Sequence, residues 1–367
     1  MKKILVFGAS GDTGTYFVRY FLDHYNDSEY EVVAVGTRET DRFARMGVPY
    51  YRVDITQKNA FDCLPKDIYA VVDLAGAMPA RMKGYDPYKY IDVNITGTLN
   101  ILEFCRKTGA DRILFAQSFG DIKDHAEKDP LLTVDLPRKF SFKSDHTVYV
   151  MSKDFAVDLI ENYHQMYGLK RFIFRLPTIY LYSPIDTYYV DGTNRKIGYR
   201  ILIDKAAQGE TIEVWGDPNR VKDMVYVKDF CQMLYKAVFA DRTEGYYNVG
   251  TGVGTSLLRQ IEGMIEVFGP ENKKSEIIMR PDKPNAPQYV MDIAPARREL
   301  GYEPEYDYIS MLQDMKMEME SLRSRVFSDQ ERKGEQNWTI ISLLPVPPCP
   351  AWKNTLKRSA PSGTATG

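Results

Sequence analysis

Tyr149 and Lys153 lie four residues apart in a stretch with a helical pattern, so their side chains share one helix face. A tyrosine with a pKa of about 10 is a poor base near neutral pH, but a nearby ammonium stabilises its phenolate and lowers that pKa. The pair is therefore a candidate for proton transfer. The same spacing recurs at Tyr85 and Lys89, where Pro87 is expected in the first helical turn and leaves Tyr85 outside the helix.

Ser118 is the candidate third member of this group. It follows the apolar run Ile113 to Phe115, which predicts a strand, and open α/β sheets bind ligands at the carboxyl ends of their strands. Its hydroxyl could hydrogen bond the substrate oxygen that Tyr149 deprotonates. A lone serine at such a position is more often a turn residue, and only its combination with Tyr149 and Lys153 favours a catalytic role.

A glycine-rich loop joins the first predicted strand, Ile4 to Phe7, to a helical pattern. In this position the first glycine can make a tight turn, the second lets the backbone approach a pyrophosphate, and the third seats the helix on the sheet. The motif predicts a dinucleotide site rather than a mere turn. Its predicted cofactor-binding residues are Gly8, Ser10, Gly11, Asp12, Thr13 and Gly14.

The choice between NAD and NADP depends on the end of the second predicted strand. An acid usually stands there to bind the ribose 2′-hydroxyl, but the sequence continues as Gly36-Thr37-Arg38. The missing carboxylate and the guanidinium of Arg38 slightly favour NADP, although Arg38 can also be read as a solvated loop residue. Asp54 could contact the adenine or cap a helix expected to start at Thr56, and capping is the simpler interpretation.

The order of the remaining patterns predicts the fold class. Further apolar, β-branched runs occur at 32–35, 70–74, 113–115 and 171–175, separated by helical stretches. This alternation is typical of an α/β protein with a doubly wound parallel sheet that helices cover on both faces. Residues 1–178 are predicted to form an NAD(P)-binding domain, to which some later strands and helices return.

Residues 179–325 are predicted to form a smaller α/β substrate-binding lobe. Its expected parts are a loop from Tyr180 to Gly192, a helix from about Arg200, and short strands near Ile212 to Trp215 and Tyr247 to Val249. From about Val326 the pattern becomes charged, then proline-rich, then rich in small polar residues. Residues 326–367 are therefore predicted to be a disordered tail.

Composition excludes several classes of function. The chain has 367 residues with 48 Lys and Arg against 50 Asp and Glu, so no strong positive field favours nucleic acid as a partner. No apolar run approaches the roughly 20 residues of a membrane span, and the start is too short for a signal peptide, which predicts a cytoplasmic protein. The cysteines and histidines are scattered, which disfavours a metal site and a disulfide framework.

Together these residues resemble the extended short-chain dehydrogenase/reductase family, in its nucleotide-sugar epimerase/dehydratase branch, over about residues 3–325. The resemblance includes Leu74-Ala75-Gly76, Asn94 to Asn100, Gly216, Lys222 to Asp229, Tyr247 to Gly252, and Asp292 with Arg297 to Tyr302. It implies a Rossmann-like fold and a homodimer formed through the helices at Tyr88 to Arg106 and Tyr149 to Tyr167. It also implies that Leu74, Ala75 and Gly76 bind cofactor, together with Tyr149 and Lys153, and that Lys153 holds the ribose.

The resemblance further implies a nucleotide diphosphate-sugar as substrate. Lys222 stands where an arginine typically contacts the diphosphate, Arg220 is close by, and Arg280 resembles a second phosphate contact. Cations aimed at the phosphates are what such a substrate requires. Each of the three could instead be an ordinary surface charge.

The departures from the family pattern bear on the reaction. Dehydratases of this branch carry an Asp-Glu pair directly after the catalytic hydroxyl residue, and decarboxylases use a glutamate there, whereas Ser118 is followed by Phe119-Gly120. Thr178, which is expected to bind substrate, replaces a typical asparagine, and Leu181 stands where glycine is usual, so the implied sugar pocket is unusual. The leading hypothesis is an epimerase that transiently oxidises a sugar hydroxyl. The alternatives are an NADPH-dependent keto-sugar reductase, a dehydratase, or a noncatalytic dinucleotide sensor.

Overall fold

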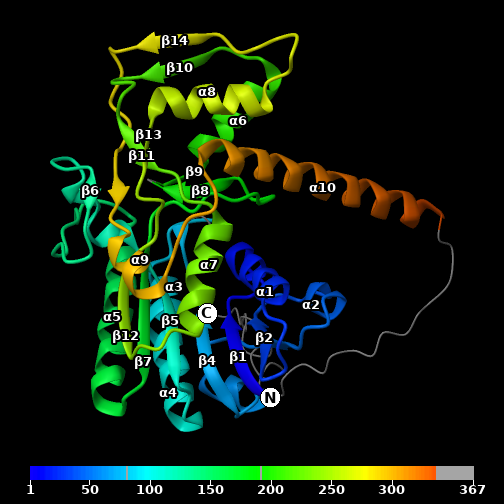
Figure 1. Ribbon diagram of the computed structural model, residues 1–367, viewed down its shortest axis with the longest axis vertical. Coiled ribbons are helices and arrows are strands. Elements are labelled where there is room, and N and C mark those ends of the chain that lie inside the picture. Colours follow the sequence, from blue (N-terminus) through cyan, green and yellow to red (C-terminus); the bar gives the residue numbers. More distant parts are fainter. Residues whose placement is uncertain (80–81, 191, 336–367) are drawn as a thin grey trace, which may run out of the picture.

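The computed structural model describes residues 1–79, 82–190 and 192–335, with side chains described as far as Ser321 (Figure 1). Its centre is a seven-stranded sheet in the order β12-β7-β5-β4-β1-β2-β3, in which every neighbouring pair is parallel. The strands are β1 (Lys2–Phe7), β2 (Tyr30–Gly36), β3 (Tyr50–Arg52), β4 (Ile68–Asp73), β5 (Arg112–Ser118), β7 (Lys170–Leu176) and β12 (Glu244–Asn248). The doubly wound α/β fold is thus confirmed.

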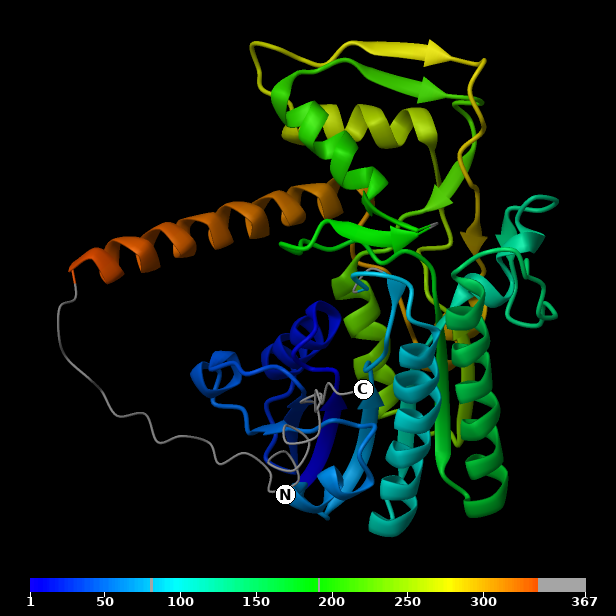
Figure 2. The same ribbon diagram turned by 180° about the vertical axis from the view of Figure 1, so that it is seen from behind.

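Both faces of this sheet are buried, which explains the continuous apolar runs of its strands. Ile4 and Val6 of β1 belong to one core, which includes residues of α1 (Asp12–His24) and α7 (Val227–Val238). Leu5 and Phe7 belong to the other core, with residues of α4 (Thr98–Thr108) and α5 (Thr147–Tyr167). The two pairs of helices lie on opposite sides of the sheet in Figures 1 and 2.

The assignment of Tyr247 to Val249 to the smaller lobe is wrong. β12 pairs in parallel with β7 at the edge of the large sheet. The cause is α7, which buries Phe230 and Leu234 in the sheet core and so carries the chain back to the amino ends of the strands. The strand that follows this crossover adds in parallel beside β7, at one edge of the sheet.

The predicted helix from Tyr88 to Arg106 is divided into three parts. They are α3 (Pro87–Tyr90), the π-helical η3 (Ile91–Gly97) and α4. Asp86 caps α3 by accepting a hydrogen bond from the backbone N of Lys89, so Tyr85 lies outside the helix as predicted. Shorter elements connect the strands: α2 (Arg42–Arg45), η1 (Lys58–Cys63), η4 (Phe119–Asp121), η5 (Lys123–His125) and β6 (Leu131–Leu132).

The segment after β7 contains more structure than predicted. The expected loop from Tyr180 to Gly192 includes β8 (Thr187–Val190), which pairs antiparallel with β9 (Thr193–Lys196). Gly192 has a φ of 75°, the left-handed conformation that a tight hairpin turn requires. The β-forming residues Thr187 to Val190 explain why this part of the segment is a strand.

The remaining elements form small sheets and helices above the carboxyl edge of the large sheet (Figure 2). β10 (Ile212–Trp215) pairs with β14 (Ile277–Arg280), β11 (Val221–Asp223) with β13 (Gly254–Ser256), and β15 (Val290–Met291) with β6. The helices are α6 (Gly198–Gln208), α8 (Leu257–Phe268) and α9 (Ala294–Leu300). Ile203, Val214 and Met264 join the same core as the α1 and α7 side of the sheet.

The last described element is α10 (Tyr308–Glu335). Its first turns bury Met311, Leu312 and Met315, and the rest of the helix extends away from the body (Figures 1 and 2). Residues 326–335 of the predicted disordered tail are therefore helical, because their Glu, Arg, Lys and Gln are good helix formers. Residues 336–367 lie outside the described residues.

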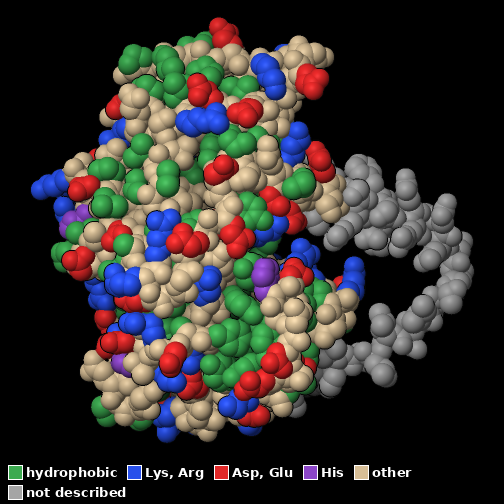
Figure 3. Space-filling model, viewed as in Figure 1, with side chains coloured by type: hydrophobic (Ala, Val, Ile, Leu, Met, Phe, Trp, Pro, Cys, Tyr) green, Lys and Arg blue, Asp and Glu red, His purple; other side chains and the backbone are tan. Residues whose placement is uncertain are grey.

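The described surface carries mixed charges. On the face drawn in Figure 3, Lys and Arg side chains are interspersed with Asp and Glu. Among the helices of the described part, none combines the length and the apolar character needed to cross a bilayer.

Gly8 has no tolerance for a side chain. Its φ is 77°, and an added Cβ would lie 2.6 Å from the backbone N of Ala75 and from the carbonyl carbon of Leu74. Gly47 has a similar φ of 69° but nothing within 4 Å of an added Cβ. We predict that Gly47→Ala lowers the free energy of unfolding by about 1 kcal/mol, the conformational cost alone. Gly8→Ala should cost at least about 2 kcal/mol more, because the backbones must also move apart.

Urea unfolding of both variants measures this difference. Equal losses for Gly8→Ala and Gly47→Ala would show that the close approach of the two loops does not limit this position.

Candidate active site

The glycine loop closes on itself and leaves a helix end open. The backbone N of Gly11 donates to the carbonyl of Gly8 at 2.9 Å, and a Cβ on Gly14 would lie 2.4 Å from that same oxygen. α1 begins at Asp12 with Gly11 as its N-cap, and no side chain caps its first N–H groups. These donors, in the turn that also holds Ser10 and Thr13, fit a dinucleotide pyrophosphate.

The loop after β4 lies against this turn. The backbone N of Leu74 donates to the carbonyl of Phe7 at 3.0 Å, and Ala75 is in contact with Gly8. A side chain on Gly8 would occupy the space in which the two loops meet. Leu74, Ala75 and Gly76 are thus placed beside the glycine loop, where a bound dinucleotide would pass.

Asn94 connects this loop to the helix of Tyr149 and Lys153. Its side chain accepts from the backbone N of Ala77 at 2.8 Å and donates to the carbonyl of Ala77 at 3.0 Å. It also donates to Oγ of Ser152 at 2.9 Å, and Ser152 donates to the carbonyl of Tyr149 at 2.7 Å. Asn94 belongs to the π-helical η3, a distortion that is frequent at functional sites.

The structure brings Ser118, Tyr149 and Lys153 together. Ser118 ends β5, and its hydroxyl lies close enough to the phenol of Tyr149, which α5 carries, to lower the pKa of that phenol. Lys153, one turn further along α5, places Nζ 3.9 Å from the centre of the Phe115 ring on β5. Both hydroxyls and the ammonium thus lie at the carboxyl edge of the sheet, as the sequence predicts.

The ionisation of these groups is dominated by burial. Burial raises the pKa of Tyr149, and the nearby Ser118 hydroxyl lowers it by less. Burial lowers the pKa of Lys153 to about 8, opposed by the charge of Asp73. Lys153 is not among the groups that shift the pKa of Tyr149, so the expected lowering of that pKa by the ammonium is not seen in this structure, and desolvation of the phenolate dominates.

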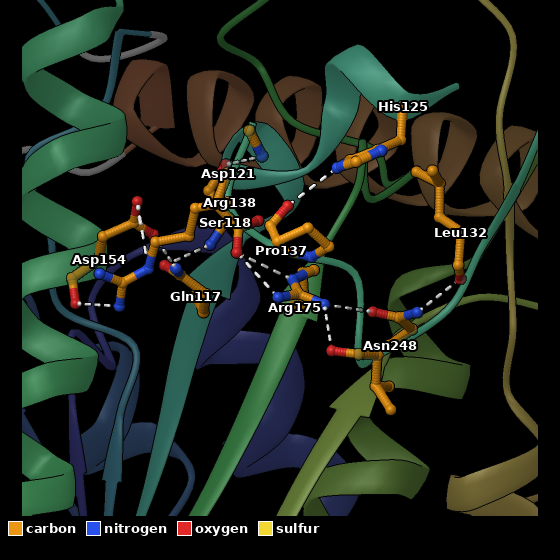
Figure 4. Close-up of polar contacts among 12 residues, drawn as sticks. Gln117, Ser118, Asp121, His125, Leu132, Pro137, Arg138, Asp154, Arg175 and Asn248 are labelled. Carbon is orange, nitrogen blue, oxygen red and sulfur yellow. Dashed lines mark hydrogen bonds and ion pairs between the residues drawn. The ribbon is translucent and has the colours of Figure 1, made fainter. Parts of the chain in front are cut away.

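A polar network beneath the site holds Ser118 in place (Figure 4). The side chain of Gln117, which is buried, accepts from the backbone N of Ser118 at 2.9 Å and donates to Oδ1 of Asp154 at 2.6 Å. Asp154 directly follows Lys153 on α5, so one amide links both strand and helix of the site. Burial, with the nearby charge of Asp121, raises the pKa of Asp154 to about 6.

A buried ion pair orders the turn after Ser118. Nη2 of Arg175 on β7 donates to Oδ2 of Asp121 at 2.8 Å, and Arg175 also contacts Asn248 on β12 at 3.4 Å (Figure 4). Asn248 in turn donates to the carbonyl of Leu132 at 2.7 Å. Asp121 is thus held by Arg175, which leaves Phe119 and Gly120 as the residues next to Ser118.

Sequence reasoning did not find Gln117, Asp121, Asp154 or Arg175. The sequence indicates two of them only by their position, since Gln117 directly precedes Ser118 and Asp154 directly follows Lys153. A buried polar residue beside a catalytic one usually supports it by hydrogen bonding.

The end of β2 has no room for an acid. A Cβ on Gly36 would lie 2.5 Å from Oγ of Ser10, so a carboxylate side chain would displace that hydroxyl. Arg38 donates to the carbonyl of Ser10 at 3.1 Å, and Arg42 donates to Oγ1 of Thr15 at 2.8 Å. Two guanidinium groups therefore stand beside the glycine loop.

Asp54 has a local role in this structure. Its Oδ1 accepts from the backbone N of Thr56 at 3.0 Å and from the Thr56 hydroxyl at 2.8 Å. This supports the turn that precedes η1, whose first residue is Lys58 rather than Thr56.

The residues predicted to bind substrate lie in different environments. Thr178 is exposed and follows β7 at the carboxyl edge, while Lys222 lies on β11, where burial lowers its pKa. Nε of Arg220 donates to the carbonyl of Ala286 at 2.6 Å. Arg280 is held by Glu213 at 2.7 Å and by Asp282 at 2.9 Å, so it must exchange these partners to bind a phosphate.

No cluster of three or more His, Cys, Asp or Glu side chains suited to a metal ion occurs within the described residues. Of the four cysteines, Cys105 and Cys231 are buried and Cys63 is half-buried, and Cys349 lies outside the described residues.

Curated proteins with similar sequences include named sugar enzymes. The chain is 28% identical to the low-salt glycan biosynthesis protein Agl12 of Haloferax volcanii, over 83% of this chain and 94% of that protein. It is 27% identical to a putative UDP-glucose 4-epimerase of Methanocaldococcus jannaschii, with the same coverage of 83% and 94%. Other relatives are named dTDP-glucose 4,6-dehydratase and UDP-glucuronic acid decarboxylase.

Solved structures share the fold. The UDP-glucose 4-epimerase of Thermotoga maritima, determined with UDP-glucose, aligns with a TM-score of 0.68 at 21% identity, over 86% of this chain and 99% of that one. The UDP-glucose 4-epimerase of Thermus thermophilus, determined with NAD, is another such structure.

The family match spans most of the large sheet and its crossovers. The family described as "NAD dependent epimerase/dehydratase family" matches residues 4–250, from β1 to the end of β12, which is more than half of the chain. The glycine loop and the group of Ser118, Tyr149 and Lys153 all fall inside this range. The chain is therefore an enzyme of the NAD dependent epimerase/dehydratase family.

Proposed function

We propose that the protein is a nucleotide-sugar epimerase that transiently oxidises a sugar hydroxyl to a ketone. The observation that carries this proposal is the group of Ser118, Tyr149 and Lys153 at the carboxyl edge, with Phe119 and Gly120 rather than carboxylates in the two positions after Ser118. Expulsion of water needs an acid and a base next to the serine, but Phe119 and Gly120 occupy those positions and Asp121 is paired with Arg175. Relatives named as epimerases agree with this choice.

The proposed mechanism assigns one task to each side chain. A bound nicotinamide dinucleotide supplies the acceptor and donor of the hydride. Tyr149 takes the proton of the sugar hydroxyl as the ketone forms, and returns it when the alcohol forms again. Ser118 would hydrogen bond the same oxygen. Lys153 would hold the ribose of the bound cofactor, and in that complex its ammonium would favour the phenolate of Tyr149. The ketone presents its other face between the two proton transfers, which inverts the carbon.

We propose NADP rather than NAD as the preferred cofactor. Arg38 and Arg42 are cations beside the glycine loop, and Gly36 leaves no room for the acid that binds a ribose 2′-hydroxyl. A 2′-phosphate is the group that such guanidinium side chains recognise. Solved relatives are complexes with NAD, so this preference would distinguish the present chain from them.

The second candidate function is an NADPH-dependent reductase of nucleotide keto-sugars. The same Tyr149 and Ser118 would then protonate and hold the ketone oxygen once, and the alcohol would leave. The two guanidinium groups near Ser10 favour this alternative, because NADPH is the usual donor in reductive synthesis. It consumes reduced cofactor in proportion to product, whereas the epimerase does not.

The proposed substrate is a nucleotide diphosphate-sugar held from above the sheet. Lys222 and Arg220 are near each other on and before β11, and Arg280 lies at the end of β14. Their charges would face the diphosphate, and Thr178, with Ser118, would face the sugar. The proposed lobe of residues 179–325 supplies Arg220, Lys222 and Arg280, whereas Ser118 and Thr178 belong to residues 1–178.

We also propose a homodimer formed through α3, η3, α4 and α5. Large apolar side chains on these helices are exposed, among them Ile91 (41%), Met151 (47%) and Phe155 (49%). Met151 and Phe155 are four residues apart, so they form one stripe along α5. A second copy that packs on this stripe would remove it from water.

The first prediction from this proposed function concerns Tyr149. Tyr149→Phe should keep cofactor binding but lower turnover by about 100-fold or more, because the proton acceptor is lost. The measurement is mass spectrometry of UDP-, dTDP-, GDP- and CDP-sugars and their keto forms, incubated with protein and either pyridine nucleotide. An isomer of unchanged mass indicates the epimerase, and a gain of two hydrogens the reductase.

Tyr85→Phe is the matched control. Tyr85 has the same spacing to a lysine but is 45% exposed and outside its helix, so turnover should not change. Normal turnover in Tyr149→Phe, or an equal loss in both variants, would contradict the assignment of Tyr149 as the proton acceptor. Loss of water in the product would establish a dehydratase instead.

The second prediction concerns the cofactor. Arg38→Ala should weaken NADPH binding by about tenfold or more and NADH binding by less than about threefold, because only NADPH carries the 2′-phosphate. Fluorescence titration of both reduced cofactors gives the two dissociation constants. Arg45→Ala, an exposed arginine on the neighbouring α2, should change neither. Tighter binding of NADH than NADPH by the unmodified protein would overturn the preference.

The third prediction concerns the dimer. Phe155→Glu should convert the protein to monomers, because it buries a carboxylate in the proposed interface. Sedimentation velocity measures the change. Val253→Glu alters a residue that is 64% exposed in the turn before β13 and should leave the dimer intact. A monomeric unmodified protein, or a Phe155→Glu dimer, would refute this arrangement.

A further inference from the structure

Asp73 is a buried acid that the proposed reaction does not use. It is the last residue of β4, and its register partners are Phe7 on β1 and Phe115 on β5. Its exposed fraction is 1%. The two flanking positions in the sheet are thus aromatic, and neither provides a charge for the carboxylate.

The hydrogen bonding of Asp73 is incomplete. Oδ1 accepts from the backbone N of Ala75 at 3.0 Å, but Oδ2 has no hydrogen-bond partner among the described residues. A buried carboxylate in this state is strongly disfavoured unless an opposite charge is near. Burial accordingly raises the pKa of Asp73 to about 6.

Lys153 supplies the opposite charge on the same side of the sheet. Its Nζ lies 3.9 Å from the centre of the Phe115 ring, and Phe115 is the direct neighbour of Asp73 across the strands. Since side chains paired in register point to the same face, ammonium and carboxylate lie near each other without forming a direct ion pair. Lys153 is itself only 6% exposed, so water screens their attraction weakly.

The electrostatic effects of the two residues are mutual. Lys153 lowers the pKa of Asp73, and Asp73 raises that of Lys153, in each case against the effect of burial. From α4, the thiol of Cys105 also faces Asp73, and burial raises its pKa above the ordinary value. Asp154 is directed elsewhere, to Gln117 and Arg138. Asp73 is thus the carboxylate that acts on Lys153.

We propose that Asp73 is a positioning residue that acts through Lys153, keeping its side chain protonated and in place at neutral pH. This inference rests on the proposed function for its effect on turnover, but the effect on Lys153 exists without any substrate. Loss of the carboxylate would leave a buried ammonium with no counter-charge. The ammonium would then release its proton at lower pH and no longer favour the phenolate of Tyr149.

The test replaces the carboxylate by an amide of nearly the same shape. In Asp73→Asn, an NMR titration of 15N-labelled lysine side chains should show the midpoint of Lys153 lowered by about one pH unit or more. This is a tenfold change in its ratio of charged to neutral forms. Lys153→Met identifies the signal. The ratio of turnover at pH 8 to turnover at pH 6.5 should also fall, by about fivefold.

Asp229→Asn is the matched control. Asp229 on α7 is also fully buried, also accepts one backbone hydrogen bond through Oδ1, from Glu305 at 2.7 Å, and also has an Oδ2 without a partner in the described part. It has no lysine in the catalytic group to act on. Its substitution should leave both the Lys153 midpoint and the pH dependence of turnover unchanged.

The outcomes separate this inference from the proposed function. A Lys153 midpoint unchanged in Asp73→Asn, or shifted equally in Asp229→Asn, overturns it. If Asp73→Asn does not fold, Lys153→Met tests the same coupling, because removing the ammonium must raise the titration midpoint of the Asp73 carboxyl in 13C spectra. An Asp73 midpoint that is unchanged in Lys153→Met also overturns the inference. A protein that turns over no nucleotide-sugar would contradict the function but leave the titrations decisive.

Discussion

The close approach of Gly8 to the backbone of Leu74 and Ala75 is the constraint on which the site depends. It fixes the ends of β1 and β4 at a separation that no side chain could occupy. From there, hydrogen bonds run through Ala77 and Asn94 to Ser152 on α5. The loop that fits a pyrophosphate and the helix that carries the proposed base are thus parts of one connected unit.

Several residues buried at the carboxyl edge of the sheet are polar, unlike those in its middle. Its middle is apolar on both faces, but its edge buries Gln117, Asp121, Asp154 and Arg175. Such groups are costly to desolvate, and they are tolerated because each is hydrogen bonded into the network of Figure 4. The benefit is a rigid support for Ser118, which a loop alone would not provide.

The features that the sequence predicts correctly are local ones. The glycine loop, the strands and the spacing of Tyr149 to Lys153 each depend on residues a few positions apart. The network at Gln117 and the position of β12 depend on contacts between distant segments, and no periodic pattern records these. A run of β-forming residues at Thr187 to Val190 was visible, but nearby Asp and Gly made the segment resemble a loop. The charged composition of residues 326–335 likewise indicated a disordered tail, although these residues continue α10.

The central claim is that a carbon–hydrogen bond of the sugar is broken and remade by hydride transfer. Turnover in deuterium oxide, followed by return of the isolated product to ordinary water and mass spectrometry, tests it directly. Hydride that is passed to the cofactor and back does not exchange with solvent, so the account predicts an epimer without deuterium on carbon. An epimer that has gained one deuterium on carbon would show that solvent protons enter the sugar, and would contradict the account.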